Sequence, residues 1–513
     1  MKKKNKQRVG IQPIMSYILL IIGVIIFSGI FALLDFQSTY YSISSVTYSF
    51  SPITENITSL FSLSGLKYIF ENTVANFATF TVLTHIIILL IGISIMERSG
   101  FLKTAITMLT KKAKRRNVTF VFVLLCILSS IMGDLSYIIF IPLGALLFLY
   151  GKRNPATGII CAFASLSCGT GINLFLSSTD STMLNYTKLA ALTINDSYNI
   201  NRYAFMIIMA ALIILASIVI TYVTENMTVK KVPRFDFDET TEDDEIIITN
   251  ARKRGMLFAG IASFCYLLFF IYNIIPGLPL SGNLLDYSQT YYIDKLFSPD
   301  SFFSSGFVFI VTVLFVILGL FYGLGARTIK NHKDFCDYLS HSLDGIGNML
   351  VMIFFASTFI SIFKHSNIGD VIVSWFANII GNSNFNGMSL IVLMFILVAI
   401  GNIFVPSSAS KWLMMSATVV PTFMSAGITP EFTQVIFRLA ESSTMNITPI
   451  LAYFIIYFAY LEKYNQNNKR VKFKDAFKYQ LPYTAVIAFV YIAIIIVWYI
   501  IGIPLGINTY PTL

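Results

Sequence analysis

Charged residues are scarce in this chain of 513 residues. Asp, Glu, Lys and Arg make up 12% of the sequence and hydrophobic residues 56%, with a mean hydropathy of +0.73. Soluble globular domains carry about 25% charged and about 45–50% apolar residues. The composition therefore excludes a soluble globular domain and predicts a multi-pass protein of the cell membrane.

Cysteine is also rare, and its pattern excludes two kinds of site. The five cysteines are odd in number, form no CxxC pair and lie mostly within apolar runs. A disulfide framework needs paired cysteines, and a thiolate metal site needs closely spaced ones. We therefore expect buried thiols and no cofactor from Cys126, Cys161, Cys168, Cys265 and Cys336.

The formal net charge of +10 arises from basic residues in short loops between apolar runs. Lys and Arg in such loops set the orientation of a membrane protein and meet anionic lipid, so we expect the bilayer as a partner and no nucleic acid. Most of the 36 basic residues fall on one side if the N-terminus is cytoplasmic. An odd number of spans then leaves the C-terminus extracytoplasmic.

Nine apolar segments are long enough to cross a bilayer, which takes about 20 residues of helix. They cover residues 14–34, 77–96, 157–178, 203–223, 255–275, 303–324, 345–363, 429–464 and 482–503. The eighth segment is long and interrupted by polar residues. The fold class we predict is an all-α polytopic integral membrane protein.

Two further apolar regions do not fit as single spans. Residues 118–150 carry Gly133 and Asp134 at their centre, and residues 388–424 carry the polar stretch 401–412. Polar backbone within hydrocarbon is tolerated where it lines a cavity, so each region predicts a re-entrant hairpin of two short helices with a polar tip.

Hydropathy divides the chain into two similar halves. A cytoplasmic segment, 1–13, precedes the first membrane half, 14–223; a charged linker, 224–254, leads to the second half, 255–505, and an extracytoplasmic tail, 506–513. Each half contains a hairpin and an interrupted span, and the hairpins enter from opposite sides. This is the pattern of an inverted repeat, so we expect the two tips to approach each other.

The second hairpin carries the densest cluster of candidate binding residues. A broken helix next to hydroxyl and amide groups can present its backbone to a bound ion or anion. Small residues also permit tight helix packing, which is the simpler explanation for any single serine. The cluster as a whole predicts a substrate site formed by Asn402, Ser407, Ser408, Ser410 and Trp412, to which Asn446 of the eighth span also contributes.

Glu441 is the main candidate for ion coupling. It precedes Asn446 and Pro449 in the interrupted eighth span, where unwinding would expose carboxylate, amide and carbonyl oxygens. Such oxygens suit Na⁺, which Asn402 and Glu441 could hold together, or a titrating proton. The alternative is a static ion pair with Arg438, three residues earlier on the same helical face.

The first half offers three matching polar residues. Asn173 and Asp180 occupy the interruption of the third span, and Asp134 lies at the first hairpin tip. We assign Asn173 and Asp180 to substrate binding and Asp134 to ion coupling. Both carboxylates could instead cap helices, because they lie beside Gly and Ser residues typical of helix ends.

The chain resembles the p-aminobenzoyl-glutamate transporter (AbgT) family. The resemblance lies in GNIFVPSSASKW (401–412), PEFTQVIFRLAESSTMNITP (430–449), YGLGARTIK (322–330), FFASTF (354–359) and GDLSY (133–137). By position, Asp180, Asn402, Trp412 and Glu441 match functional positions of the family. The family has Asp at position 441, Gly or Ala near Pro406, and a neutral residue at Lys364.

The resemblance implies a homodimer of subunits with nine spans and two hairpins around a water-filled basin. It also implies ion-coupled transport of an aromatic anion, either p-aminobenzoyl-glutamate or a sulfonamide-like antimetabolite, driven by H⁺ or Na⁺. Two alternatives remain: an intramembrane enzyme with an Asp134 and Asp180 pair, and an uncoupled channel. The sequence contains no Ser/His or HExxH constellation for catalysis, and opposed hairpins suit alternating access better than a channel.

Overall fold

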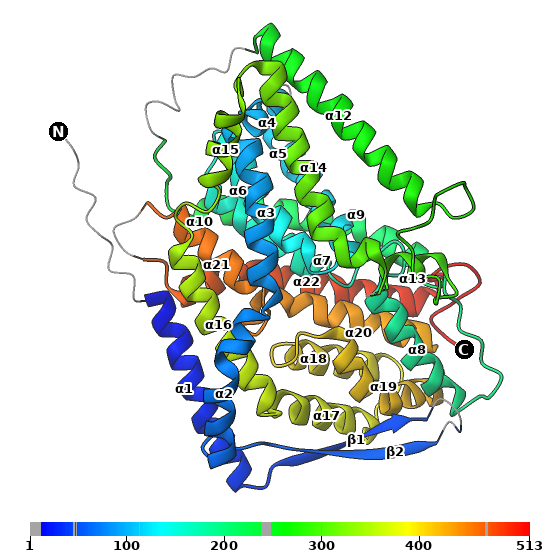
Figure 1. The fold of residues 1–513 in the computed structure, drawn as a ribbon. Helices are drawn as coiled ribbons and strands as arrows, with labels where there is room; N and C mark the ends of the chain where they lie inside the picture. The colour runs from blue at the N-terminus through cyan, green and yellow to red at the C-terminus, as the bar shows by residue number, and fades with distance from the viewer. Residues whose placement is uncertain are drawn as a thin grey trace.

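The computed structural model describes residues 12–513 except 45, 46, 48, 112, 238–247, 299 and 467–469. Most of the acidic stretch of the predicted linker and nearly all of the predicted N-terminal segment lie outside the described residues. The rest of the chain is almost entirely helical (Figure 1). The predicted division into two membrane halves stays a prediction.

Eight helices within the described residues are long and apolar enough to cross a membrane. Seven of them match predicted spans: Ile14–Leu33, Leu63–Arg98, Met206–Lys231, Asn250–Ile274, Phe302–Ala326, Gly347–His365 and Phe473–Ile501. The eighth, Arg115–Met132, is the first arm of a predicted hairpin. Of the other two predicted spans, 157–178 holds one short helix followed by irregular chain, and 429–464 is broken into shorter helices.

The first predicted hairpin, residues 118–150, is broken near its middle. Helix α5 (Arg115–Leu128) continues into the short 3₁₀ helix η1 (Ser129–Met132), and α6 (Leu135–Tyr150) leaves in a new direction. Gly133 makes the turn at φ +60, a conformation that favours glycine. Helix α7 (Pro155–Gly169) then packs on α6 so closely that a Cβ on Gly158 would lie 2.2 Å from the Gly144 carbonyl oxygen.

Irregular chain follows α7 and precedes α8 (Ser178–Leu192). The side chain of Ser177 accepts a hydrogen bond from the amide of Asp180, and the Asp180 carboxylate accepts one from the Ser177 amide. This reciprocal capping box starts α8. The interruption between α7 and α8 is therefore determined by residues near the cap.

The second broken region repeats this arrangement. Helices α18 (Met388–Gly401) and α19 (Ser408–Ser425) form the second hairpin, with irregular chain at 402–407. Helix α20 (Pro430–Thr444) begins at a Thr429 cap followed by proline, ends in η3 (Met445–Ile447), and is separated from α21 (Phe454–Lys463) by irregular chain. Every residue of α20 is buried, and Figure 1 shows this helix in the middle of the molecule.

The remaining helices surround these broken elements. The described residues also include α1 (Gln12–Leu33), α2 (Leu63–Ala78), α3 (Thr81–Arg98), α4 (Phe101–Thr110), α9 (Met206–Val223), η2 (Thr224–Thr228), α10 (Val229–Lys231), α12 (Asn250–Ile274), α13 (Tyr292–Phe297), α14 (Phe302–Ala326), α15 (His332–Ser340), α16 (Gly347–His365), α17 (Ile368–Gly381) and α22 (Phe473–Ile501). Helix α12 packs on α14 and leaves Leu257, Ile261, Phe264 and Leu268 exposed. An apolar outer face of this kind is expected where lipid is the solvent.

One β-hairpin departs from the predicted all-α fold. Strands β1 (Gln37–Ile43) and β2 (Phe50–Asn56) pair antiparallel, with Gln37 opposite Asn56. The hairpin lies against α17 and α19 (Figure 1), and Asn378 donates a hydrogen bond of 2.9 Å to the Thr39 carbonyl. Residues 37–56 contain no long apolar run, so hydropathy gave no sign of these strands.

Candidate functional site

The two hairpin tips line a single cavity of about 700 Å³. The first tip contributes residues 130–134 and the second contributes 406–409, although the tips lie far apart in the sequence. This confirms the prediction that the tips approach each other. The cavity therefore lies where four broken helical segments, α5 with α6 and α18 with α19, converge.

Aromatic and hydroxyl groups form much of the cavity wall. The rings of Tyr137 and Tyr453 stack at 5.2 Å between centroids and 10° between planes, and both residues line the cavity. Ser361 accepts a hydrogen bond of 2.6 Å from Asn76 on another wall. Lys364, near the end of α16, is an exposed basic side chain of the lining. Such a wall offers flat apolar surface, hydroxyls and positive charge.

Arg438 lies behind the two tips and connects both halves of the chain. Its Nε lies 2.9 Å from Asp180 Oδ1, and one terminal nitrogen donates to the Thr170 carbonyl at 2.7 Å. The other donates to Ser408 Oγ at 2.9 Å and contacts Glu441. Arg438 is only 3% exposed. A buried guanidinium is tolerated when its nitrogens are paired in this way.

Glu441 has two basic partners instead of the single one considered from the sequence. One carboxylate oxygen contacts Arg438 and accepts a hydrogen bond of 2.7 Å from Ser408. The other lies 3.0 Å from Lys411 Nζ. We call Asp180, Arg438, Glu441 and Lys411 the ionic network. It contains two cationic and two anionic side chains, so its formal charges balance.

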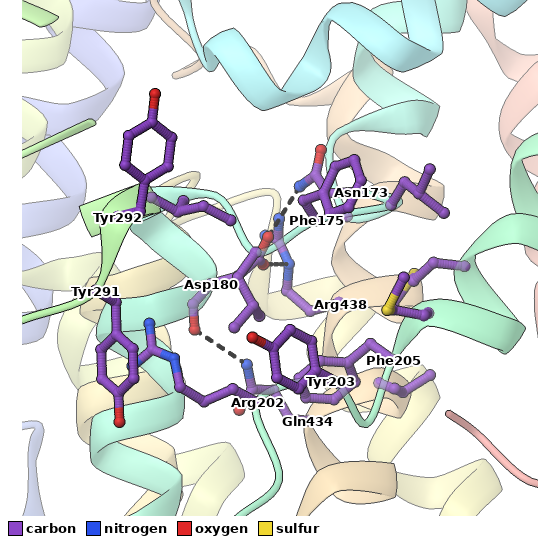
Figure 2. Close-up of a pocket in the computed structure, with 17 residues that line it drawn as sticks. Asn173, Phe175, Asp180, Arg202, Tyr203, Phe205, Tyr291, Tyr292, Gln434 and Arg438 are labelled. Atoms are coloured by element: carbon purple, nitrogen blue, oxygen red, sulfur yellow. Dashed lines mark hydrogen bonds and ion pairs between the residues drawn. The ribbon is translucent and has the colours of Figure 1, made fainter. Parts of the chain in front are cut away.

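Asp180 combines its capping role with its ion pair. Its Oδ2 accepts hydrogen bonds from Asn173 Nδ2 at 2.9 Å and Ser177 Oγ at 2.7 Å, while Oδ1 faces Arg438 (Figure 2). The capping interpretation of Asp180 is therefore confirmed, and its role in substrate binding stays a prediction. Asp134 lines the large cavity at the first hairpin tip, and no hydrogen bond or ion pair joins it to Asp180 within the described residues.

A smaller cavity of about 160 Å³ lies on the other side of the Asp180 and Arg438 pair (Figure 2). Arg202 lines it, forms an ion pair of 2.8 Å with Asp294 and lies 3.8 Å over the Tyr291 ring. Asp294 belongs to α13, in the second half of the sequence. This wall of the small cavity is thus closed by a contact between the two halves.

The predicted site residues separate into three groups. Asp134, Asn173, Ser407 and Ser408 line the large cavity. Asn402 and Glu441 are fully buried behind it: Asn402 Nδ2 donates to the Glu441 carbonyl at 2.9 Å and its Oδ1 contacts Lys411. Ser410 lies at the start of α19, where its hydroxyl is 2.9 Å from that of Ser407.

Trp412 and Asn446 form the third group and do not line the cavity. The indole of Trp412 is fully buried, donates to Thr187 Oγ1 at 2.8 Å and packs on Phe437. Asn446 donates to the Gln480 carbonyl at 3.2 Å and accepts from Thr484. These contacts connect helices, and the predicted binding roles of both residues stay predictions without a cavity contact in this conformation.

Sequence reasoning did not assign roles to Lys411, Tyr137 or Tyr453. The signal for Lys411 was present, because a lysine within a membrane-grade apolar stretch requires a partner. The tyrosines carried no comparable signal: the chain contains 27 tyrosines, and most resemble interfacial residues. Their stacking in the cavity wall depends on the packing of α6 against the chain before α21.

Broken helices around one polar cavity, within a shell of membrane-length helices, define a multi-pass membrane protein. A sequence model of the AbgT transporter family matches residues 8–513, and the chain therefore belongs to that family. The protein is thus a membrane transporter of small molecules. The alternative of an intramembrane enzyme with an Asp134 and Asp180 pair is wrong.

The chain is similar to several known proteins over most of its length. It is 26% identical to the p-aminobenzoyl-glutamate transport protein of Escherichia coli (strain K12) over 458 residues, 89% of this chain and 87% of that protein. Among solved structures, it is 24% identical to the YdaH transporter of Alcanivorax borkumensis, covering 96% of this chain and 100% of that one at a TM-score of 0.48. For MtrF of Neisseria gonorrhoeae, identity is 26%, coverage is 97% of each chain and the TM-score is 0.48.

Proposed function

We propose that this protein is a secondary active transporter that moves an aromatic anion of the p-aminobenzoyl-glutamate type by ion-coupled alternating access. The second substrate class that we propose is sulfonamide-like antimetabolites, which the protein would export. The Escherichia coli relative is named for p-aminobenzoyl-glutamate, and its similarity extends over most of both chains. That relationship supports the substrate class.

The observation that carries the proposal is the chemistry of the large cavity. A volume of about 700 Å³ lies within the range of pockets for drug-sized ligands. The stacked Tyr137 and Tyr453 offer ring surface for a benzoyl group, and Lys364 offers a positive charge for a carboxylate. Arg438 also borders the cavity, but its nitrogens already contact protein oxygens. Lys364 is therefore the side chain we assign to the substrate carboxylate.

The topology we propose counts each broken helix pair as one span. Helices α7 with α8 and α20 with α21 then act as interrupted spans, which completes nine spans with two re-entrant hairpins. The cytoplasmic N-terminus, extracytoplasmic C-terminus and homodimeric assembly complete the proposal. The distribution of basic residues supports the orientation.

Coupling is assigned to carboxylates at the two tips. Glu441 lies behind the second tip in the ionic network, and Asp134 lies on the cavity wall at the first. A change in the charge of either carboxylate would strengthen or weaken its contacts with neighbouring groups, and those contacts stabilise the positions of the two tips. The coupling ion is H⁺ or Na⁺, and Asn402 with Glu441 is the position that the sequence suggests for Na⁺.

Transport into proteoliposomes tests this function directly. The purified protein should accumulate radiolabelled p-aminobenzoyl-glutamate, with saturation, when a pH or Na⁺ gradient is imposed. Glu441→Gln should abolish gradient-driven accumulation but retain substrate exchange. Glu71→Gln, which alters an exposed surface ion pair, is the matched control and should retain transport. Flux that is non-saturable and only downhill would instead identify an uncoupled channel.

A further inference from the structure

The ammonium group of Lys411 lies between the two oxygens at which a coupling Na⁺ is expected. Its Nζ is 3.0 Å from Glu441 Oε2 and also contacts Asn402 Oδ1. The Lys411 side chain is 1% exposed, so this charge cannot be stabilised by water. We propose that Lys411 is a built-in cation that excludes Na⁺ from the Asn402 and Glu441 position. This inference rests on the proposed ion-coupled function of that position.

The first argument concerns ligands. A Na⁺ held by Asn402 Oδ1 and Glu441 Oε2 would need the space and the oxygen lone pairs that the ammonium group uses. The other Glu441 oxygen contacts Arg438 and Ser408, and the amide nitrogen of Asn402 faces the Glu441 carbonyl.

The second argument concerns charge. Arg438 and Lys411 already balance Asp180 and Glu441 within the buried network. An added Na⁺ would lie beside an ammonium group with no further carboxylate of the network to compensate it. Like charges at such short distance are strongly unfavourable where water is excluded. Removing the lysine charge should favour Na⁺ binding. One Glu441 oxygen then has no cationic partner, and the ionic network has two carboxylates but only one cation.

Lys411 is therefore a specificity-determining residue for the coupling ion. With Lys411 in place, Na⁺ cannot be the ion that binds Asn402 and Glu441, and a proton becomes the coupling ion at the tips. A proton needs neither a coordination sphere nor the space that the ammonium group fills. A neutral residue at position 411 is expected to create Na⁺ binding that the natural chain lacks.

A sodium titration of the purified protein tests the proposal without transport. The thermal unfolding temperature is measured in detergent as NaCl replaces choline chloride at constant ionic strength. The natural protein and Lys411→Arg should show no Na⁺-specific change, whereas Lys411→Met should gain a saturable upward shift. Lys364→Met removes a lysine from the cavity and is the matched control, expected to remain insensitive to Na⁺.

Each outcome decides the question. Saturable Na⁺-specific stabilisation of the natural protein would overturn the proposal, as would a folded Lys411→Met variant that does not respond to Na⁺. If Lys411→Met is monodisperse only in NaCl, Na⁺ replaces the ammonium group and the proposal holds. If it is misfolded in both salts, Na⁺ does not replace the ammonium group and the proposal fails.

Failure of the proposed function has a different signature. Proteoliposomes that do not accumulate p-aminobenzoyl-glutamate under any gradient would refute the substrate and coupling assignments, while the sodium titration would be unaffected. The opposite result is also informative. If a Na⁺ gradient drives accumulation by the natural protein and the sodium titration of that protein is positive, the transport function is supported. Only the proposed role of Lys411 is then refuted.

Discussion

Arg438 Nε lies 2.9 Å from Asp180 Oδ1, and this buried pair joins residues that are 258 positions apart in the sequence. Asp180 starts α8 after the interruption of the first half, whereas Arg438 belongs to α20 in the second. The pair separates the large cavity from the smaller one, since Arg438 lines both. Movement of one half against the other must therefore stretch or remake this contact.

Breaking that pair should destabilise the protein. Removing one partner of a buried ion pair costs about 3–5 kcal/mol, because the other charge is left uncompensated. We expect Asp180→Asn to lower the thermal unfolding temperature clearly, as measured in detergent. Lys67→Gln alters an exposed pair with Glu71 and should cost under about 1 kcal/mol. Equal unfolding temperatures for both variants would show that the Asp180 contact contributes little.

Lys364→Gln should weaken substrate binding. A hydrogen bond to a charged group contributes about 1.5–3 kcal/mol, which corresponds to an affinity loss of roughly 10- to 100-fold. Lys364→Arg keeps the positive charge and should bind within a few-fold of the natural protein. Equilibrium binding of p-aminobenzoyl-glutamate measures both, with Lys67→Gln as the control. Unchanged affinity in Lys364→Gln would remove this lysine from the proposed site.

Cysteines at the two tips should react with a small water-soluble thiol reagent. Met132 and Ser407 line the large cavity, so Met132→Cys and Ser407→Cys should label and be protected by substrate. The background should first lose the exposed Cys265 and Cys336. Ser165→Cys, in the fully buried part of α7, should remain unlabelled. Labelling of the tips that substrate does not slow would place the substrate outside this cavity.

Trp412→Phe should affect stability more than binding. The change removes the hydrogen bond from the indole to Thr187 and leaves unfilled space beside Phe437. We expect a loss of about 1–3 kcal/mol in the free energy of unfolding and substrate affinity within a few-fold. Trp375→Phe is a suitable control, because that ring is exposed. A large loss of affinity with unaltered stability would instead support stacking of Trp412 on the substrate.

The Arg202 and Asp294 pair should restrain α13 against the turn that precedes α9. Its distance of 2.8 Å and the stacking of Arg202 on Tyr291 close one wall of the smaller cavity. Arg202→Gln should therefore raise the rate at which a cysteine at Gln434 is labelled, because the cavity beside it opens more often. Lys67→Gln in the same background is the control. An unchanged labelling rate would show that the pair does not govern access.

Local properties of the sequence are sufficient to predict the class of protein and the positions at which its helices break. Hydropathy is summed over neighbouring residues, and polar residues, glycine and proline act on their own backbone, so both properties can be read locally. The hairpin turn at Gly133 and the irregular chain at 402–407 followed from such signals. The β-hairpin of residues 37–56 did not, because short half-exposed strands leave only a weak pattern.

Which polar groups face the cavity and which face each other depends on the packing of distant helices. Asn402, Glu441 and Lys411 are as polar as Ser407 and Asp134, and nothing in their spacing distinguishes the two sets. The first set is buried by helices from distant parts of the chain, and its members satisfy one another. Partner choice within a low-dielectric interior depends on distances of a few ångströms between α8, α19 and α20, and those distances arise from packing.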